Sequence, residues 1–261
     1  MLTNKTILIT GIASDKSIAY GIAKQASALG AKLILTYQND ALKSRVEKLA
    51  ESLNAYPPIP CDVADDASLE ALPSLIRPYT DTIDGLVHCI AYADKSQLEG
   101  DFTKNITRSG FLQAQEISAY SFAALAKHTR SLLSSGASLL TLTYIGSSRA
   151  MPSYNTMGCA KASLEAMVRY MALDLGKDDI RVNAISAGAI RTLAASGIKG
   201  FKKLHKHQAN ITPLKQALTT DQVGDVAAFL LSHMSRAITG EVIFADNGFH
   251  LIGAALPEEA V

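Results

Sequence analysis

The chain has 261 residues and a formal net charge of +1; 48% of its residues are hydrophobic and 19% are charged. This composition excludes an extended disordered chain, and the nearly neutral balance excludes the strong field that nucleic acids or anionic membranes attract. We therefore expect one domain that acts on a small-molecule or carrier-bound substrate and has no nucleic-acid partner.

Cysteine usage and the apolar segments indicate the compartment. Cys61, Cys89 and Cys159 form no CxxC pair and no metal-ligand spacing, so we expect reduced thiols and no metal site. The first eleven residues lack the apolar region of a secretory signal, and no stretch approaches the ~20 apolar residues that span a bilayer. We expect a cytoplasmic protein without membrane insertion.

Short runs of β-branched and apolar residues alternate with longer segments of helical periodicity. In chain order, the expected elements are a strand at Thr6–Thr10, a helix at Ile18–Leu29, a strand at Lys32–Tyr37, a helix at Asp40–Leu53, a weaker strand at Tyr56–Pro60, a helix at Ser68–Tyr79, a strand at Ile83–Ile90, a helix at Gly110–Leu133, a strand at Ser138–Ile145, a helix at Tyr154–Leu175, a strand at Arg181–Ser186, a helix at Thr220–Leu231 and a strand at Glu241–Ala245. This alternation is typical of βαβ units. It predicts an α/β protein: one Rossmann-type domain over residues 1–261, with a doubly wound, mostly parallel seven-stranded sheet and helices on both faces.

Two segments after expected strands lack regular periodicity, Tyr92–Asn105 and Ala187–Asn210. In open α/β sheets, ligands bind outside the carboxyl ends of the strands, where both segments would lie. The second is long enough to form a substrate-binding lid at about 190–210.

The segment Gly11–Gly21 joins the first strand to the first helix, where Rossmann proteins bind a pyrophosphate. It lacks the GxGxxG spacing, so Ser17 would supply the helix cap and a hydroxyl in place of a second glycine. An ordinary strand-to-helix turn explains these residues equally well.

The second strand ends at Tyr37–Asp40, where Rossmann enzymes contact the adenosine ribose. No arginine is present there to bind a 2′-phosphate, which favours NADH over NADPH, although Lys43 is close enough to reach. Asp62 follows the third strand and is either an acceptor for the adenine amino group or a helix cap.

The segment Tyr144–Lys161 carries the candidate chemistry. Tyr154 and Lys161 lie seven residues apart, close to two helical turns, so they share one helix face. At roughly 10 Å along the axis the lysine cannot reach the phenol unaided, but it can reach a ribose hydroxyl of a bound cofactor. A phenol hydrogen aimed at a carbonyl oxygen stabilises the charge that develops during hydride transfer. The alternative is that these tyrosines and the lysine are packing and surface residues.

These residues resemble the bacterial enoyl-acyl-carrier-protein reductases, a divergent branch of the short-chain dehydrogenase/reductases. The likeness runs from Ile7 to about Gly248 and is carried by Ser17–Gly21, Thr36–Asp40, Cys61–Val63, Tyr144–Ala166, Arg181–Gly188 and Arg191–Ile198. The Tyr-x6-Lys spacing separates this branch from ordinary members of the superfamily, which have Tyr-x3-Lys.

The resemblance implies NADH-dependent reduction of the trans-2 double bond of enoyl thioesters in type II fatty-acid elongation. It implies that Tyr144, Tyr154 and Lys161 are catalytic. It places NAD against Gly11, Ser17, Ile18, Gln38, Asp62, Val63, Ile90, Lys161, Ile190, Arg191, Thr192, Leu193 and Ala194. It places the substrate against Ala93, Leu98, Tyr144, Tyr154, Met157 and Phe201. It further implies enoyl-acyl-carrier protein as substrate and a homotetramer; for Met157 and Phe201, core packing is an equal alternative.

Several positions depart from the family pattern. Cys89–Tyr92 replaces Ser-Ile-Gly-Phe and adds a methyl group at Ala91, beside the expected nicotinamide pocket. His205 and His207 fit a solvated helix face better than a ligand pair. A carbonyl or sugar reductase of the wider superfamily and a dinucleotide-binding protein without catalysis are the competing functions; a pure binder would not need the phenol donor.

Overall fold

The computed structural model describes residues 1–192, 195 and 201–253, apart from the side chains of 201, 202 and 204. Its centre is one seven-stranded sheet in the order β3-β2-β1-β4-β5-β6-β7, and every neighbouring pair is parallel. The strands are β1 (Thr6–Ile9), β2 (Lys32–Tyr37), β3 (Ile59–Pro60), β4 (Ile83–His88), β5 (Leu133–Thr143), β6 (Arg181–Ala187) and β7 (Val242–Ala245). The predicted fold class is confirmed.

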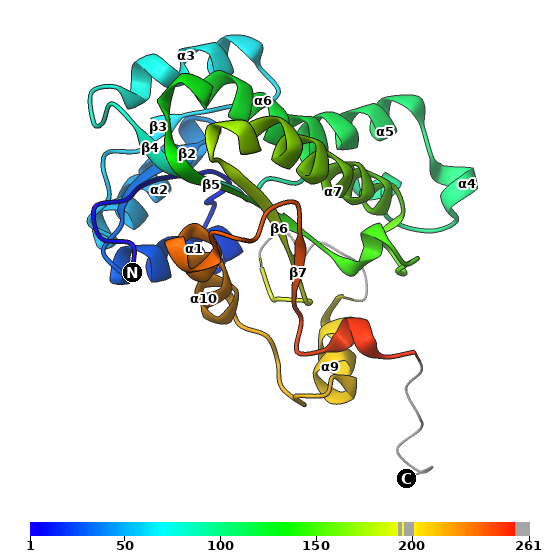
Figure 1. The fold of residues 1–261 in the computed structure, drawn as a ribbon. Coiled ribbons are helices and arrows are strands. Elements are labelled where there is room, and N and C mark those ends of the chain that lie inside the picture. The colour runs from blue at the N-terminus through cyan, green and yellow to red at the C-terminus, as the bar shows by residue number, and fades with distance from the viewer. Residues whose placement is uncertain (193–194, 196–200, 254–261) are drawn as a thin grey trace.

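Helices cover both faces of the sheet (Figure 1). One face packs against α1 (Ile18–Ala28), α2 (Asp40–Ser52) and α10 (Thr220–Leu231). The other face carries α3 (Asp66–Ile76), α5 (Arg108–Gln115), α6 (Ser121–Thr129) and α7 (Asn155–Leu175). The short α4 (Phe102–Asn105) precedes α5, and α9 (Phe201–Ile211) lies apart from these layers, near the end of β7.

The alternation of side chains along each strand explains the two layers. Ile7 and Ile9 belong to the core cluster under α1 and α10, whereas Leu8 belongs to the cluster under α3, α6 and α7. Because successive strand side chains point to opposite faces, a strand that is apolar throughout is buried on both sides. Both clusters therefore require a central sheet between two layers of helices.

Some element boundaries differ from the sequence prediction. The strand expected at Ser138–Ile145 begins at Leu133, which pairs with Ile83 of β4 before a shift in register leads to the pair Gly85–Ser138. The helix expected at Gly110–Leu133 is interrupted by a π-helical turn, η2 (Glu116–Tyr120), and ends in a 3-10 turn. The Ser118 hydroxyl in η2 donates to Tyr92 O and accepts from Tyr92 N, both at 2.9 Å. This contact with the loop after β4 accounts for the π-helical turn.

The two segments expected to be irregular also contain helices, so that prediction was wrong in part. Tyr92–Asn105 includes a 3-10 turn and α4, and Ala187–Asn210 includes most of α9. Both helices have few apolar residues, so their periodicity is weak. Within the described residues, no helix has the length and apolar character needed to cross a membrane.

Candidate active site

All seven strands end at the same edge of the sheet, and the strand order reverses between β1 and β4. Gly11 follows β1 at this reversal with a φ of +82°, and a Cβ there would collide with the carbonyl group of Cys89 after β4. Only glycine permits this close approach. The crevice where a dinucleotide binds in such sheets therefore has a floor of closely packed backbone.

The amino end of α1 opens onto this crevice. Ser17 is the N-cap of α1: its hydroxyl accepts from Tyr20 N at 3.1 Å and donates to Ser14 O at 2.8 Å. Ile18 is the first residue of the helix. The first turn contains no acidic residue, so its positive end is available to an anion.

The ends of β2 and β3 bring two polar side chains together. Gln38 is exposed, and its Nε2 lies 3.4 Å from Asp62 Oδ2. Asp62 Oδ1 accepts from Ala64 N at 3.1 Å, whereas Asp65 caps α3. Asp62 is thus not a helix cap, and an oxygen of its carboxylate faces the end of β2.

Val63, Ile90 and Ile190 form the apolar part of this edge. Val63 and Ile190 are buried and Ile90 is half-buried. Beyond β6, Thr192 N donates to Ile190 O at 2.9 Å and Arg191 is exposed. Leu193 and Ala194 lie outside the described residues.

The two tyrosines meet at the carboxyl end of β5. Tyr144 directly follows β5 and Tyr154 is the N-cap of α7; their ring centroids lie 4.9 Å apart in an edge-to-face contact. A Cβ at Gly146 would collide with the ring of Tyr154, and one at Gly158 would lie 2.7 Å from Gly146 O. These two glycines allow the first turn of α7 to approach the end of β5.

Lys161 is buried on the same helix, and its Nζ donates to Leu142 O at 2.7 Å. Burial lowers the pKa of Lys161 to about 8, while the nearby Cys89 and Glu165 act in the opposite direction. Because this pKa lies above 7, the ammonium is the main form at neutral pH. A lysine has three N–H donors, so the Leu142 carbonyl leaves donors for a ligand.

The two phenols stay neutral over the same range. Burial raises the pKa of Tyr154, and Tyr144 and Glu165 raise it further. Burial also raises the pKa of Tyr144, against a hydrogen bond from Gln208 that lowers it. A neutral phenol donates a hydrogen bond, as the predicted role at a carbonyl oxygen requires.

Four residues around this site were not predicted from the sequence. The Glu165 carboxylate accepts from Thr143 Oγ1 at 2.6 Å. His88 is fully buried, and its ring nitrogens lie 2.8 Å from Thr141 Oγ1 and 2.8 Å from Ser121 Oγ. Burial lowers the pKa of His88 to about 3, so the ring is neutral. Arg45 Nη1 of α2 donates to Ala13 O, between β1 and α1, at 3.2 Å, and Gln208 contacts Tyr144. Of these four residues, only Glu165 had a signal in the sequence, because it lies four positions after Lys161 and so on the same helix face.

Most of the predicted substrate residues gather beside Tyr154. Ala93, Leu98 and Tyr154 pack against a small cluster formed by Ala114, Met157 and Ala160. Met157 is only 7% exposed, which fits core packing, but its cluster includes the ring of Tyr154. Phe201 begins α9, and its side chain lies outside the described part of the chain.

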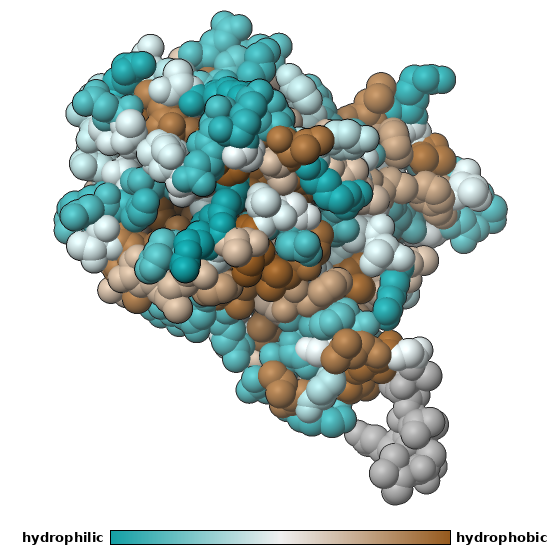
Figure 2. Space-filling view, in the orientation of Figure 1, coloured by the Kyte–Doolittle hydropathy of each residue, from teal (hydrophilic) through white to brown (hydrophobic). Residues whose placement is uncertain are grey.

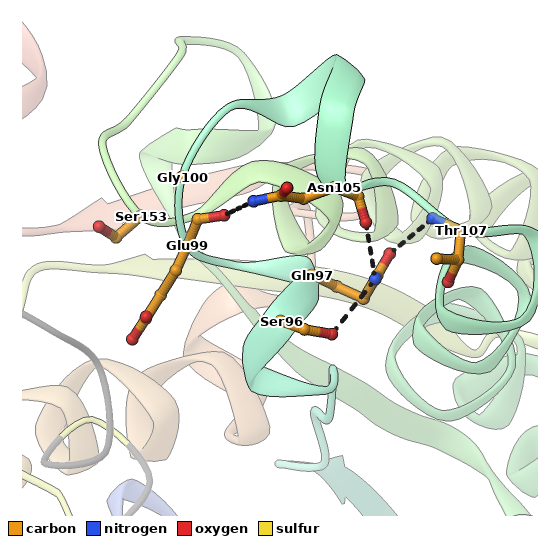
Figure 3. A pocket seen from close by; sticks show the side chains of 7 residues that line it. All are labelled: Ser96, Gln97, Glu99, Gly100, Asn105, Thr107 and Ser153. Atoms are coloured by element: carbon orange, nitrogen blue, oxygen red, sulfur yellow. Dashed lines mark hydrogen bonds between the residues drawn. The ribbon is translucent and has the colours of Figure 1, made fainter.

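The side chain of Gln97 fixes the loop that carries Leu98 (Figure 3). Its Nε2 donates to Asn105 O at 3.0 Å and its Oε1 accepts from Thr107 N at 3.1 Å. This loop borders a polar cavity of about 750 Å³, whose described lining includes neither Tyr154 nor Lys161. A second cavity of about 420 Å³ includes Tyr154 in its lining, along with Phe102 and Cys159.

Gly146→Ala should destabilise the protein because the added methyl group meets the Tyr154 ring and lies 3.2 Å from Tyr144 Cδ1. We expect the free energy of unfolding to fall by about 1–3 kcal/mol, the usual cost of overpacking, in urea denaturation followed by circular dichroism. Gly176→Ala is the matched control, because no described atom beyond the adjoining stretch of chain lies within 4 Å of its new methyl group. Equal stabilities of the two variants would contradict the packing argument.

Comparisons with known proteins point to one family. A family model described as enoyl-(acyl carrier protein) reductase matches residues 11–250. Enoyl-[acyl-carrier-protein] reductase [NADH] FabI of Salmonella typhimurium is 52% identical over 250 residues, which cover 96% of this chain and 95% of the relative. The structure of the Bacillus cereus enoyl-acyl carrier protein reductase with NADP+ and indole naphthyridinone has a TM-score of 0.94 and 45% identity, and covers 97% of this chain and 99% of that one.

A third similar protein is the enoyl-(acyl-carrier-protein) reductase of Anaplasma phagocytophilum, whose structure contains NAD. It has a TM-score of 0.94 and 42% identity, and the alignment covers 98% of this chain and 97% of that one. The family model, the relatives and the solved structures all match nearly the whole chain. They name the same family that the Tyr-x6-Lys pattern resembles. The chain belongs to the enoyl-[acyl-carrier-protein] reductase family.

Proposed function

We propose that this chain is an oxidoreductase that reduces the trans-2 double bond of enoyl thioesters on acyl-carrier protein, with NADH as reductant, in bacterial type II fatty-acid elongation. The observation that carries the proposal is the grouping of Tyr144, Tyr154 and Lys161 at the end of β5, beside the dinucleotide crevice. The names of the relatives support the same reaction.

The residues present fit a dinucleotide. Gly11 allows the backbone of the crevice floor to pack against Cys89, where any Cβ would collide, and the capped amino end of α1 suits a pyrophosphate. Gln38 and Asp62 would hold the adenosine end, with Val63 beside them. Ile90, Ile190 and Thr192 would line the nicotinamide end, and Lys161 would hold the nicotinamide ribose. We also propose contacts with the dinucleotide for Ser17, Ile18, Arg191, Leu193 and Ala194.

When bound, NADH supplies a hydride to the conjugated double bond. Tyr154 would donate its phenol hydrogen bond to the thioester carbonyl oxygen, on which negative charge develops, and so stabilise the enolate. A proton from solvent at the α-carbon completes the saturated thioester. The raised pKa of Tyr154 keeps this donor protonated. Tyr144 orients the ring of Tyr154 through their edge-to-face contact.

The acyl chain would lie against Ala93, Leu98 and Met157, which pack beside Tyr154. We propose the same contact for Phe201. Such a surface suits a hydrocarbon chain, which gains from leaving water. We propose that the segment at about 190–210 forms the lid over this substrate. The free cysteines Cys61, Cys89 and Cys159 support a cytoplasmic location, where thiols stay reduced.

Tyr154→Phe tests the central claim, because it removes the donor hydroxyl and keeps the ring. We expect turnover of a short enoyl thioester, followed by NADH absorbance, to fall by about 10²-fold or more. Tyr79→Phe, remote from the crevice, is the control and should retain wild-type turnover. Full activity of Tyr154→Phe would refute its role.

Two other outcomes of this assay would replace the proposed function. Reduction of ketones without reduction of enoyl thioesters would indicate a carbonyl reductase. Tight NADH binding without oxidation by any enoyl thioester would indicate a binding protein.

The end of β2 predicts a preference for NADH. A 2′-phosphate near Gln38 would face the Asp62 carboxylate, so we expect a lower KM for NADH than for NADPH. Gln38→Arg should shift the ratio of kcat/KM values toward NADPH by about tenfold, through a charge-assisted hydrogen bond. Ser74→Arg adds the same charge at an exposed position of α3, outside the crevice, and should leave the ratio unchanged. If both variants shift the ratio equally, the general field of the added charge is responsible.

We propose that the protein assembles as a homotetramer through the outer faces of α5, η2 and α7. Leu112 is 58% exposed, Tyr120 46%, Tyr170 76% and Leu173 81%. Figure 2 shows apolar residues at the surface over α5 and α7. Exposed apolar groups on neighbouring helices are typical of protein interfaces.

Leu173→Glu should weaken this assembly, because it places a charge in an apolar interface. We expect light scattering of the native protein to give about four times the 27.7 kDa chain mass, and the variant to give a smaller species at the same concentration. Leu214→Glu is the control, since Leu214 is also exposed but lies outside these helices. A wild-type protein that remains monomeric at micromolar concentration would end the proposal.

A further inference from the structure

A single buried side chain on α9 joins two strand ends of the site. Gln208 is 5% exposed, and its Nε2 donates to the Tyr144 hydroxyl oxygen at 3.1 Å. Its Oε1 accepts from Ala189 N, just beyond β6, at 3.0 Å. One amide therefore links α9 to the residues that follow β5 and β6.

The partners fix which way this amide points. The backbone N–H of Ala189 can only donate, so it must face the oxygen of the Gln208 amide. The NH₂ group then faces Tyr144, whose oxygen accepts. Because the phenol oxygen is occupied as an acceptor, its own hydrogen remains available to donate elsewhere in the crevice.

The position of Tyr144 matters because its ring packs edge-on against Tyr154, with centroids 4.9 Å apart. We infer that Gln208 is a positioning residue: its amide holds the Tyr144 hydroxyl and thereby orients the Tyr144–Tyr154 pair toward the substrate carbonyl. This inference rests on the proposed function for the role of Tyr154. The hydrogen bond itself and its effect on Tyr144 can be tested without catalysis.

Three groups from different elements act on the Tyr144 phenol. Burial and the charge of Asp246, which follows β7, both raise its pKa, and the hydrogen bond from Gln208 lowers it. Tyr154 of α7 provides the ring contact. Removing the amide leaves only the two raising influences, so the pKa of Tyr144 should rise.

Two substitutions separate positioning from simple packing. Gln208→Leu keeps much of the volume and removes both hydrogen bonds. Gln208→Glu keeps the acceptor for Ala189 N but presents an acceptor to Tyr144, so the phenol must donate to the carboxylate instead of into the crevice. Asn210→Leu, at an exposed position of the same helix, is the control.

The first measurement is the ionisation of Tyr144, followed by NMR of ring-labelled tyrosine and assigned with Tyr144→Phe. We expect a higher Tyr144 pKa in Gln208→Leu and Gln208→Glu than in the wild type, and no change in Asn210→Leu. An unchanged titration in both Gln208 variants would overturn the inference. This result stands whether or not the protein reduces enoyl thioesters.

The second measurement is steady-state kinetics with NADH and crotonyl-coenzyme A. We expect kcat to fall by about tenfold in both Gln208 variants, with the KM for NADH within about twofold of the wild type. If Gln208→Glu keeps wild-type kcat while Gln208→Leu loses it, the side chain only docks α9 and the inference is wrong. A wild-type protein without turnover would refute the proposed function and leave the Tyr144 titration to decide the role of Gln208.

Discussion

The site depends on one contact, the close approach of the first two turns of α7 to the carboxyl end of β5. Lys161 anchors the helix by donating to Leu142 O at 2.7 Å, and Gly146 and Gly158 remove the side chains that would hold the two backbones apart. The residues of the Tyr-x6-Lys pattern would otherwise lie on a helix with no fixed relation to the strand. Lys161 also lies close to Cys89, which packs against Gly11 at the crevice floor, so the anchor relates the end of β5 to the crevice.

Burial makes the chemistry of these groups predictable. An ammonium removed from water is costly unless it has a partner, and Lys161 has the Leu142 carbonyl and the nearby Glu165. The same low-polarity surroundings raise the pKa of Tyr154, so the phenol remains a donor. Fixed donors of this kind need little rearrangement when charge develops on a carbonyl oxygen, and this pre-organisation is the main source of their effect on rate.

Patterns of neighbouring residues were enough to predict much of this arrangement. The strand at Lys32–Tyr37 has the bounds predicted for it, because an apolar run between polar turns indicates a buried strand in a βαβ chain. Helical periodicity alone predicted that Tyr154 and Lys161 share one face; in the structure Tyr154 is the N-cap of α7 and Lys161 lies in its second turn. The contact between Gln208 and Tyr144 could not be predicted, since they lie 64 residues apart and meet only through the packing of α9. The early start of β5 and the π turn at Ser118 likewise depend on tertiary partners.

The two halves of the site are formed by different elements, and these differ in how readily they can move. The proposed nucleotide half comprises the ends of β1 to β4, where the backbones of Gly11 and Cys89 pack closely together. The proposed acyl half comprises the loop after β4, the first turn of α7 and α9, where side chains such as Gln97 and Gln208 make the connecting hydrogen bonds. Side-chain hydrogen bonds break and re-form more readily than packed strands separate. Changes in how the substrate fits should therefore arise in the acyl half. Lys161 is the proposed link between the halves, because its three donors can serve the Leu142 carbonyl and a ribose hydroxyl together.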